Sequence, residues 1–435
     1  MYLYSSLLQR ETDNRPVRVG LIGAGKFGSM FLSQLPFTPG LTVAAIADLD
    51  PAHAQANCRE VGWDETRIAA CDFTDDAERL ISSDEVDVVV EATGHPAAGI
   101  RHALLCCEHG KHVVMVNVEA DVLAGPYLAL QAKQAGIVYS MAYGDQPALT
   151  MEMVDWARSC GFRVIAAGKG TRYLPEYHYS TPDTVWSHYG LSAEQAAAAG
   201  MRSQMFNSFL DGTKSAIEMA AIANAADLRA PSDGLAFPPC NVDDLAQVLR
   251  PASAGGQLEF DGQVEVVSSL ERNGDDLERD LRWGVYCVFE APNDYSAACF
   301  RQYGMNTDDS GRYSAMYKPF HLIGMELNIS ILSAALRGRP TGSPVCFNAD
   351  AVAVAKRDLE PGETLDGEGG YTVWGKLMPA SDSVAVGALP IGLASDTRLK
   401  RALKKDQVVT AEDVEAAADT QAWRIRAEML QRFQS

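Results

Sequence analysis

The stretch VRVGLIGAGKFG, residues 17–28, decides the fold. It opens with a short apolar run typical of a buried strand and continues with the pattern GxGxxG, in which Gly23, Gly25 and Gly28 hold the three glycine positions. A second apolar run, LTVAAIADLD, follows at residues 41–50 and carries Asp48, 20 residues after Gly28. Strand, glycine turn, helix, strand and acid in this order predict a Rossmann dinucleotide-binding unit.

Each position of the turn has a physical purpose. Gly23 permits the tight turn, Gly25 lets the backbone approach a pyrophosphate, and Gly28 lets helix and strand pack closely. The free N–H groups and the positive dipole end of the helix expected at residues 29–34 favour the same anion. We therefore expect the cofactor to contact the whole turn: Gly23, Ala24, Gly25, Lys26, Phe27 and Gly28.

The acid after the second strand predicts which cofactor binds. Asp48 would accept hydrogen bonds from the adenosine ribose hydroxyls and repel a 2′-phosphate, and the next five residues supply no Arg or Lys. NAD is expected, and NADP is the less favoured alternative. Thr93, Gly94 and Asn117 each follow a later strand-like run, where nucleotide ligands of open α/β sheets bind, so we expect them in the cofactor site as well.

The chain divides into three segments that differ in composition and in the pattern of their apolar residues. Apolar runs alternate with amphipathic stretches up to about residue 139, which indicates a parallel sheet covered by helices on both faces. A middle region mixes strand-like runs with helices, and the segment after residue 345 is rich in Gly, Pro and short strands. The expected class is α/β, with a Rossmann domain at 16–155, an α+β substrate and oligomerisation domain at 156–342, and a small β-rich module at 345–435.

Composition and charge narrow the function. The 435 residues are 47% hydrophobic and carry a net charge of −20, which repels both nucleic acid and anionic lipid. No run approaches the roughly 20 apolar residues of a membrane span, and the N-terminus lacks a signal-sequence pattern. The expectation is a cytoplasmic protein whose partner is a small-molecule substrate.

Several stretches resemble the homoserine-dehydrogenase-like oxidoreductases that carry a C-terminal SAF-type module, including the 1-deoxy-D-xylulose 5-phosphate reductoisomerase-like enzymes. The matching stretches, spread over residues 16–415, are VGLIGAG, EATGHP, GKHVVMVNVEADV, AGKG, DGTKSAIEMAAIANA, KPFHL and AVAKRDLEPGE. The resemblance implies a Rossmann domain, a substrate and oligomerisation domain, an SAF-like tail, and a homodimer or higher homo-oligomer. Asp48 and a single acid near residue 145 depart from a reductoisomerase, which uses NADPH and clustered metal-binding carboxylates.

Two lysines are candidates for proton transfer. Lys169 ends the run FRVIAAGKG between two glycines, which would let it approach a ligand closely; a solvated lysine is the alternative. Lys214 and Glu218 are four residues apart on an expected helix at 213–226, so they share one face. A surface ion pair is the alternative there, but the small apolar neighbours favour a pair that is partly buried or faces a cleft.

Three further residues complete the candidate site. Glu119, with Asp121 as a weaker choice or an N-cap, follows a strand at a place that the resemblance puts beside the nicotinamide. Asp145 lies in a Gly-Asp-Gln-Pro turn, where it is a plain turn residue, a ligand with Glu218 for a divalent metal, or a partner for a lysine. His321 is the first residue of the apolar stretch 321–336. It is either a catalytic residue or simply the start of a helix.

These observations favour an NAD(P)-dependent oxidoreductase that acts on the CH–OH or carbonyl group of a sugar acid, polyol or sugar phosphate, with or without a coupled isomerisation. The alternatives within the enzyme class are 1-deoxy-D-xylulose 5-phosphate reductoisomerase-like and homoserine dehydrogenase activity. An NAD-sensing binding protein is the alternative outside it, against which the lysines and carboxylates argue, since a sensor needs no proton-transfer groups.

Overall fold

The computed structural model describes residues 2–415 and 420–433. The chain divides into two compact units. The first contains residues 1–149, 321–345 and 425–432, and the second contains residues 150–320, 346–424 and 433–435. Helices α8 (Gln146–Ser159) and α17 (Gln421–Phe433) have residues in both units.

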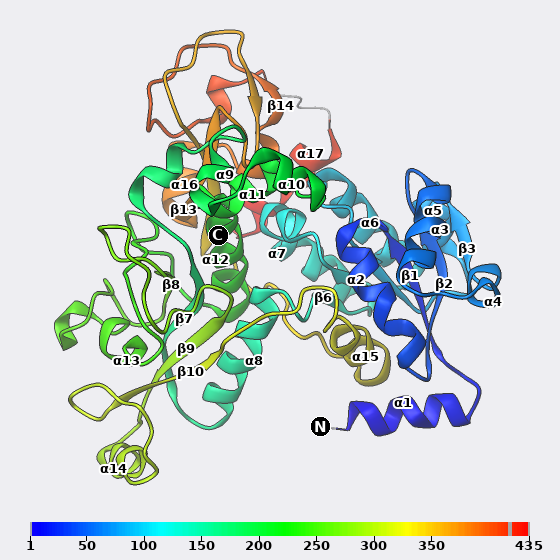
Figure 1. Cartoon of the computed structure of the whole chain (residues 1–435), viewed down its shortest axis with the longest axis horizontal. Coiled ribbons are helices and arrows are strands. Elements are labelled where there is room, and N and C mark those ends of the chain that lie inside the picture. The colour runs from blue at the N-terminus through cyan, green and yellow to red at the C-terminus, as the bar shows by residue number, and fades with distance from the viewer. Residues whose placement is uncertain (1, 416–419, 434–435) are drawn as a thin grey trace. The chain divides into compact units, whose positions relative to one another are not determined.

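A parallel sheet of six strands in the order β3-β2-β1-β4-β5-β6 forms the centre of the first unit (Figure 1). This order is that of a doubly wound dinucleotide-binding sheet, so the predicted fold class is confirmed. The strands are β1 (Val17–Ile22), β2 (Leu41–Ala47), β3 (Asp72–Thr74), β4 (Val88–Glu91), β5 (His112–Met115) and β6 (Tyr139–Met141).

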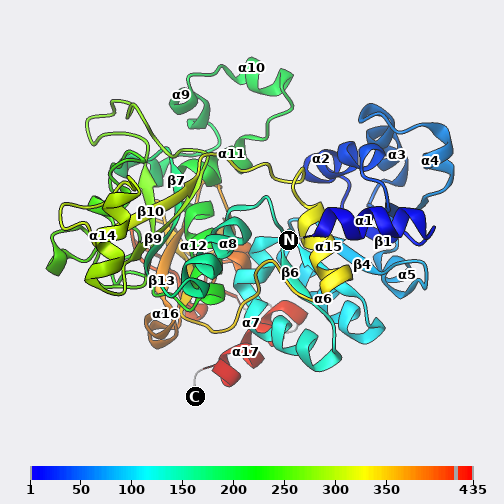
Figure 2. The same cartoon turned by 90° about the horizontal axis from the view of Figure 1, so that it is seen from below.

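Helices cover both faces of this sheet. One apolar core joins alternate residues of β1 and β4 to side chains of α1, α2, α3 and α15, and α5 lies against Gly20 on the opposite face. Figure 2 shows α1 beside α15, two helices far apart in the sequence. The helices are α1 (Leu3–Thr12), α2 (Lys26–Gln34), η1 (Leu35–Phe37), α3 (Pro51–Glu60), α4 (Glu65–Ala69), α5 (Ala77–Ser82), α6 (Pro96–His109), α7 (Val118–Ala135) and α15 (Asn328–Arg337).

The second unit is built around a mixed sheet in the order β10-β9-β7-β8, in which β7 and β8 are parallel and the other pairs antiparallel. Two small antiparallel pairs, β11 with β13 and β12 with β14, add the β-rich part near the C-terminus. The strands are β7 (Arg163–Thr171), β8 (Gln263–Ser268), β9 (Val285–Glu290), β10 (Tyr313–Lys318), β11 (Ala349–Ala355), β12 (Thr364–Asp366), β13 (Val373–Pro379) and β14 (Ser395–Arg398).

Helix α12 (Thr213–Ala226) is the central helix of the second unit and has the bounds that its sequence predicts. It packs against β7 and β8 on one side and against β11 and β13 on another. All of its residues except Lys214 are buried, which explains why the helix is small and apolar all round. The polar side chains that it does carry, Glu218 among them, are therefore enclosed in protein.

Shorter helices complete the second unit. They are η2 (Pro175–Tyr179), α9 (Val185–Tyr189), α10 (Ala193–Ala198), α11 (Ser203–Leu210), α13 (Leu245–Val248), η3 (Ala252–Ala254), α14 (Asp294–Gln302), α16 (Ala380–Val386), η4 (Ile391–Leu393) and η5 (Ala411–Asp413). Across the described residues of both units, none of the helices combines the length and the apolar character that crossing a membrane requires.

Two expected helix starts are corrected. Helix α2 begins at Lys26 rather than at Ser29, so most of the glycine motif lies in its first turn. Helix α15 begins at Asn328 rather than at His321. Gly324 interrupts the expected helix, because its φ of +78° is not helical; a Cβ there would lie 2.9 Å from the carbonyl oxygen of Phe27, so the close packing against α2 requires glycine.

Candidate functional site

The three glycines of the motif have different surroundings. At Gly23, with φ of +94°, a Cβ would lie 2.7 Å from the carbonyl oxygen of Ala92, and at Gly28 a Cβ would lie 2.7 Å from the carbonyl oxygen of Gly23. At Gly25 a Cβ would meet nothing within 4 Å. Gly23 and Gly28 are thus required by packing, whereas Gly25 leaves the backbone open to a ligand.

The same glycine is the N-cap of α2, and no side chain caps that end. An uncapped helix start presents N–H groups and the positive end of the dipole, which bind a pyrophosphate. The residues present at the turn therefore fit a dinucleotide.

Asp48 is fixed against this turn. Its Oδ2 accepts from the N–H of Ala24 at 2.8 Å, and its Oδ1 accepts from the N–H of Asp50 at 3.1 Å. An ionised carboxylate has about four lone-pair sites, so both oxygens can still accept from ribose hydroxyls. The predicted acid thus lies directly beside the predicted glycine turn.

The other predicted cofactor residues meet at the carboxyl ends of β4 and β5. The hydroxyl of Thr93 donates to Glu91 at 2.5 Å, and Nδ2 of Asn117 donates to Thr93 at 3.3 Å and to the carbonyl of His95 at 2.9 Å. Gly94, which lies between Thr93 and His95 in the chain, has φ of +68°. Because β1, β4 and β5 are neighbours in the sheet, this cluster lies at the same edge as the glycine turn.

Helix α7 carries Glu119 and Asp121 and corrects one alternative, that of Asp121 as the N-cap. Its N-cap is Asn117, whose Oδ1 accepts from the N–H of Ala120 at 3.1 Å, so Asp121 is not the cap. Asp121 is buried one turn later and accepts from the hydroxyl of Tyr139 at 2.8 Å. Burial raises the pKa of Asp121 to about 7. Glu119 is half-buried in the first turn.

The turn that carries Asp145 lies beside the segment that carries His321. Gly144 has φ of +96°, and a Cβ there would lie 2.8 Å from the carbonyl oxygen of Leu322. Asp145 is buried, and its Oδ1 accepts from the N–H of Gln146 at 2.8 Å. The interpretation of His321 as the first residue of a helix is wrong, because α15 starts seven positions later.

In the second unit, Lys169 of β7 forms an ion pair with Glu218 of α12. The two side chains are 6% and 3% exposed, so the pair is almost fully removed from water. Lys214, four residues before Glu218 on the same helix, is half-buried. The structure adds Lys169, which the sequence did not connect with Glu218. Two of the proposed catalytic groups are thereby brought into direct contact.

The glycines on either side of Lys169 have a packing cause that the sequence did not reveal. A Cβ at Gly168 would lie 1.9 Å from the carbonyl oxygen of Glu265, and one at Gly170 would lie 2.1 Å from that of Leu281. Close contact with neighbouring backbone therefore requires both glycines.

A second buried ion pair joins Asp211, which lies just before α12, to Lys356 in the C-terminal β-rich part. Lys356 donates to Asp211 at 2.8 Å and to the carbonyl oxygens of Ser180 and Gly370 at 2.7 Å each. His178 donates from Nδ1 to the carbonyl of Asp211 at 2.7 Å and stacks on Trp374 with ring centroids 3.9 Å apart. Burial lowers the pKa of His178 to about 4. Sequence reasoning missed this cluster, although Lys356 lies in the quoted stretch AVAKRDLEPGE.

The two candidate metal ligands, Asp145 and Glu218, belong to different compact units. Within residues 2–415 and 420–433, no three His, Cys, Asp or Glu side chains come together as metal ligands would. We therefore derive no step of the chemistry through a metal ion.

Comparison with known families gives two matches, one to the segment that contains the glycine turn and one to the segment that contains Lys169. Residues 23–139 match the model of the homoserine dehydrogenase NAD-binding domain, and residues 144–327 match the model of the catalytic domain of oxidoreductase DRL. Both matched segments thus resemble domains of oxidoreductases, the first of them an NAD-binding domain. The first match confirms the homoserine-dehydrogenase part of the expected resemblance, and the second contains Lys169, Lys214 and Glu218.

The solved structures that match this chain are distant in sequence. Myo-inositol dehydrogenase from Lactobacillus casei, in complex with NAD(H) and myo-inositol, is 16% identical over 39% of this chain and 50% of its own, with a TM-score of 0.30. An NAD binding oxidoreductase from Klebsiella pneumoniae is 15% identical over 69% of this chain and 66% of its own, with a TM-score of 0.30. A "probable dehydrogenase" from Thermotoga maritima is 14% identical over 74% of this chain and 90% of its own, with a TM-score of 0.40.

The chain spans about half the length of the first of these solved structures. No curated protein matches the sequence.

Proposed function

We propose that this oxidoreductase transfers hydride between NAD and the hydroxyl or carbonyl carbon of a small polar metabolite of the sugar-acid, polyol or sugar-phosphate class. The observation that carries the proposal is the buried pair of Lys169 and Glu218 within the segment that matches an oxidoreductase catalytic domain. An ionic pair enclosed by apolar side chains has an unfavourable desolvation term, and such arrangements are concentrated at functional sites.

NAD, when bound, supplies the hydride acceptor or donor. The uncapped start of α2 at Gly25 would hold its pyrophosphate, and Asp48 would accept from the adenosine ribose. Thr93, Gly94 and Asn117 would line the continuation of the groove along the carboxyl edge of the sheet. The negative charge of Asp48 at the ribose favours NAD over NADP.

Lys169 would handle the proton of the reacting oxygen. In the direction of reduction, the carbonyl carbon gains hydride and the carbonyl oxygen gains a proton from the Lys169 ammonium, which leaves a neutral amine. In the direction of oxidation, the neutral amine accepts the hydroxyl proton as the carbon loses hydride. A positioned proton donor of this kind contributes roughly 10²–10⁴-fold to a rate.

Glu218 would position Lys169. Its carboxylate lies against the Lys169 ammonium and holds it in place, and an ammonium held in this way can also stabilise an alkoxide electrostatically. Lys214, Glu119, Asp145 and His321 stay candidates for substrate contacts. A coupled isomerisation, as in reductoisomerase-like enzymes, would need a substrate with a neighbouring tertiary alcohol.

The remaining assignments are part of the same proposal. They are the domain boundaries 16–155, 156–342 and 345–435, the SAF-like character of the last segment, and assembly as a homodimer or higher homo-oligomer.

The test is turnover of NAD, followed by absorbance of NADH, with a panel of sugar acids, polyols, sugar phosphates and homoserine. We expect turnover with at least one hydroxylated substrate, and Lys169→Met is the matched inactive control. Tight NAD binding without turnover by any member of the panel would favour a sensor of NAD instead. Turnover restricted to homoserine would move the activity to that of homoserine dehydrogenase.

A further inference from the structure

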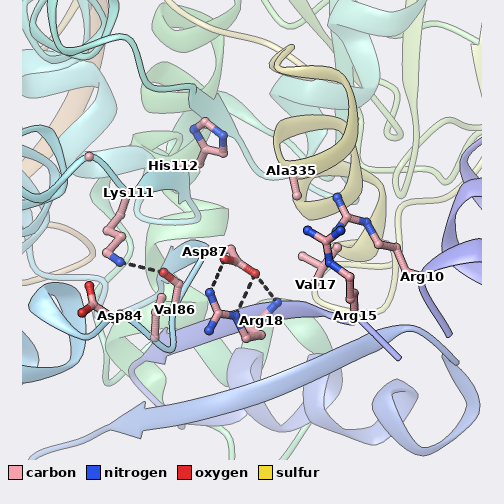
Figure 3. A pocket seen from close by; sticks show the side chains of 11 residues that line it. Arg10, Arg15, Val17, Arg18, Asp84, Val86, Asp87, Lys111, His112 and Ala335 are labelled. Atoms are coloured by element: carbon pink, nitrogen blue, oxygen red, sulfur yellow. Dashed lines mark hydrogen bonds and ion pairs between the residues drawn. The ribbon is translucent and has the colours of Figure 1, made fainter. Parts of the chain in front are cut away.

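A cavity of about 400 Å³ lies at the amino ends of β1, β4 and β5 in the first unit (Figure 3). Its walls include Val17 and Val86, which lie at or just before the starts of two of these strands. The glycine turn and Asp48 lie at the opposite, carboxyl ends of the strands. Since β1 has six residues, about 20 Å of strand separates the cavity from the cofactor turn.

The lining of the cavity is positively charged, although the whole chain carries a net charge of −20. Its cationic side chains are Arg10, Arg15, Arg18 and Lys111, and its carboxylates are Asp84 and Asp87. Four cations against two carboxylates leave an excess of two positive charges. On an acidic protein, such an excess in a concave site is a local attraction for anions.

Two of the four cations have protein partners. Arg18 donates from Nη2 to Asp87 at 2.7 Å and from Nη1 to Glu85 at 3.1 Å. Lys111 donates from Nζ to the carbonyl oxygens of Ser83 at 2.7 Å and Val86 at 2.9 Å. Figure 3 draws the contacts of Arg18 with Asp87 and of Lys111 with Val86 as dashed lines. These contacts join the segments at the amino ends of the strands.

The other two cations, Arg10 and Arg15, have no hydrogen-bond or ion-pair partner for their guanidinium groups among residues 2–415 and 420–433. Arg10 is half-buried in the last turn of α1, and Arg15 follows in the segment that enters β1. Figure 3 shows both side chains on the same side of the cavity as Ala335. Two guanidinium forks without a carboxylate partner are suited to a bidentate grip on an oxyanion.

His112 adds a neutral donor to this lining. Its Nδ1 accepts from the N–H of Val138 at 3.0 Å, so the ring proton of the neutral form is on Nε2. Burial lowers the pKa of His112 below its ordinary value. Within the described part of the chain, no side chain or carbonyl accepts from this Nε2–H.

We propose that this cavity binds a compact polyanion with at least two negative charges, a multivalent phosphate or carboxylate, held by Arg10 and Arg15 with His112 as a third donor. Arg10 and Arg15, the two lining arginines without a carboxylate partner in the described part of the chain, set the charge of the ligand. A volume of about 400 Å³ is at the lower end of small-molecule sites, which run from about 300 to 1,000 Å³, and it sets the size. The bound anion would tie α1 to the amino edge of the sheet.

The proposal is tested by titration calorimetry of the full chain with pyrophosphate and, separately, with citrate, at an ionic strength fixed with sodium chloride. We expect one of the two to bind, and the one that binds more tightly identifies the ligand as a phosphate or a carboxylate. Binding of neither anion would overturn the proposal.

Variants locate the binding. Arg10→Gln/Arg15→Gln should weaken it by at least about 100-fold, because it removes two charge-assisted hydrogen-bond donors, each of which contributes about tenfold. Arg59→Gln/Arg101→Gln is the matched control, since it removes two exposed arginines that pair with Glu65 and Glu78. It should change the affinity by less than about threefold. Should the first variant not fold, Arg15→Gln alone, at an exposed position, should weaken binding by about tenfold. Binding that survives in the Arg10/Arg15 variants would lie at the glycine turn and would overturn the assignment.

Discussion

Lys169 and Glu218 form an ion pair between a strand and a helix, with both side chains almost entirely enclosed. Neither residue needs this partner to fold locally, because Lys169 lies in a regular strand and Glu218 in a helix of small apolar residues. Substitutions in this pair therefore test whether it serves the reaction or only the stability of the fold.

Replacing Lys169 by Met keeps most of the apolar stem and removes the ammonium. With the substrate found in the panel, kcat should fall by roughly 100-fold or more, while the Kd for NAD stays nearly unchanged. Steady-state kinetics and NAD titration measure the two effects. A fall in kcat of less than about threefold would contradict the assignment, and a raised KM with intact kcat would make Lys169 a substrate anchor.

The same variant leaves the Glu218 carboxylate buried without Lys169, which should lower the free energy of unfolding by about 3–5 kcal/mol. Lys169→Met/Glu218→Gln removes the charge as well and should recover part of that stability without recovering activity. Lys400→Met, at an exposed lysine, is the control for loss of a lysine. Activity that returned with stability in the double variant would show that the pair is structural only.

The second buried pair gives a prediction about stability alone. Lys356→Met removes three hydrogen bonds, those to Asp211, Ser180 and Gly370, and leaves Asp211 buried without its cation. The free energy of unfolding should fall by about 3–5 kcal/mol. Lys404→Met removes an exposed pair with Asp358 and should lower the free energy of unfolding far less, because water screens that pair. Urea unfolding of both variants measures the difference, and equal midpoints would contradict the prediction.

Asp121 gives a prediction about pH. Its pKa is raised by burial from 3.8 to about 7, so between about pH 4 and pH 7 the folded state holds a proton that the unfolded state has lost. The contribution of Asp121 to the free energy of unfolding therefore falls as pH rises through this window. Asp121→Asn keeps the acceptor for Tyr139 and cannot ionise, so it should be more stable than the wild type at pH 8 by about 1–3 kcal/mol.

Urea unfolding of this variant and of the wild type from pH 4 to pH 8 tests the sign. The difference between them should grow with pH. A difference that stayed constant over this range would mean that Asp121 does not titrate in the window.

The sequence predicted the features that are local in the chain. Gly23–Gly28, the strand before them and Asp48 lie within 32 residues, and the bounds of α12 follow from its own composition. It did not predict the contact between Lys169 and Glu218, because Lys169 reaches Glu218 only through the packing of β7 against α12. It also placed His321 at a helix start, since an apolar pattern does not reveal that Gly324 must adopt a positive φ against α2. Contacts between residues far apart in the sequence depend on tertiary packing, which local sequence patterns do not reveal.

Asp48 provides the test of cofactor choice. Its carboxylate already accepts from Ala24 and Asp50, and it has further lone pairs for the ribose hydroxyls, so Asp48→Ala should weaken NAD binding by about 10- to 100-fold. NADP binding should weaken less or improve, because the variant removes a negative charge from the position of the 2′-phosphate, so the preference for NAD narrows. Fluorescence titration of both cofactors measures it. The control is Asp50→Ala, which removes only the cap of α3 at His53 and should leave the ratio of the two affinities unchanged. Wild-type protein that bound NADP at least as tightly as NAD would show that Asp48 does not select the cofactor.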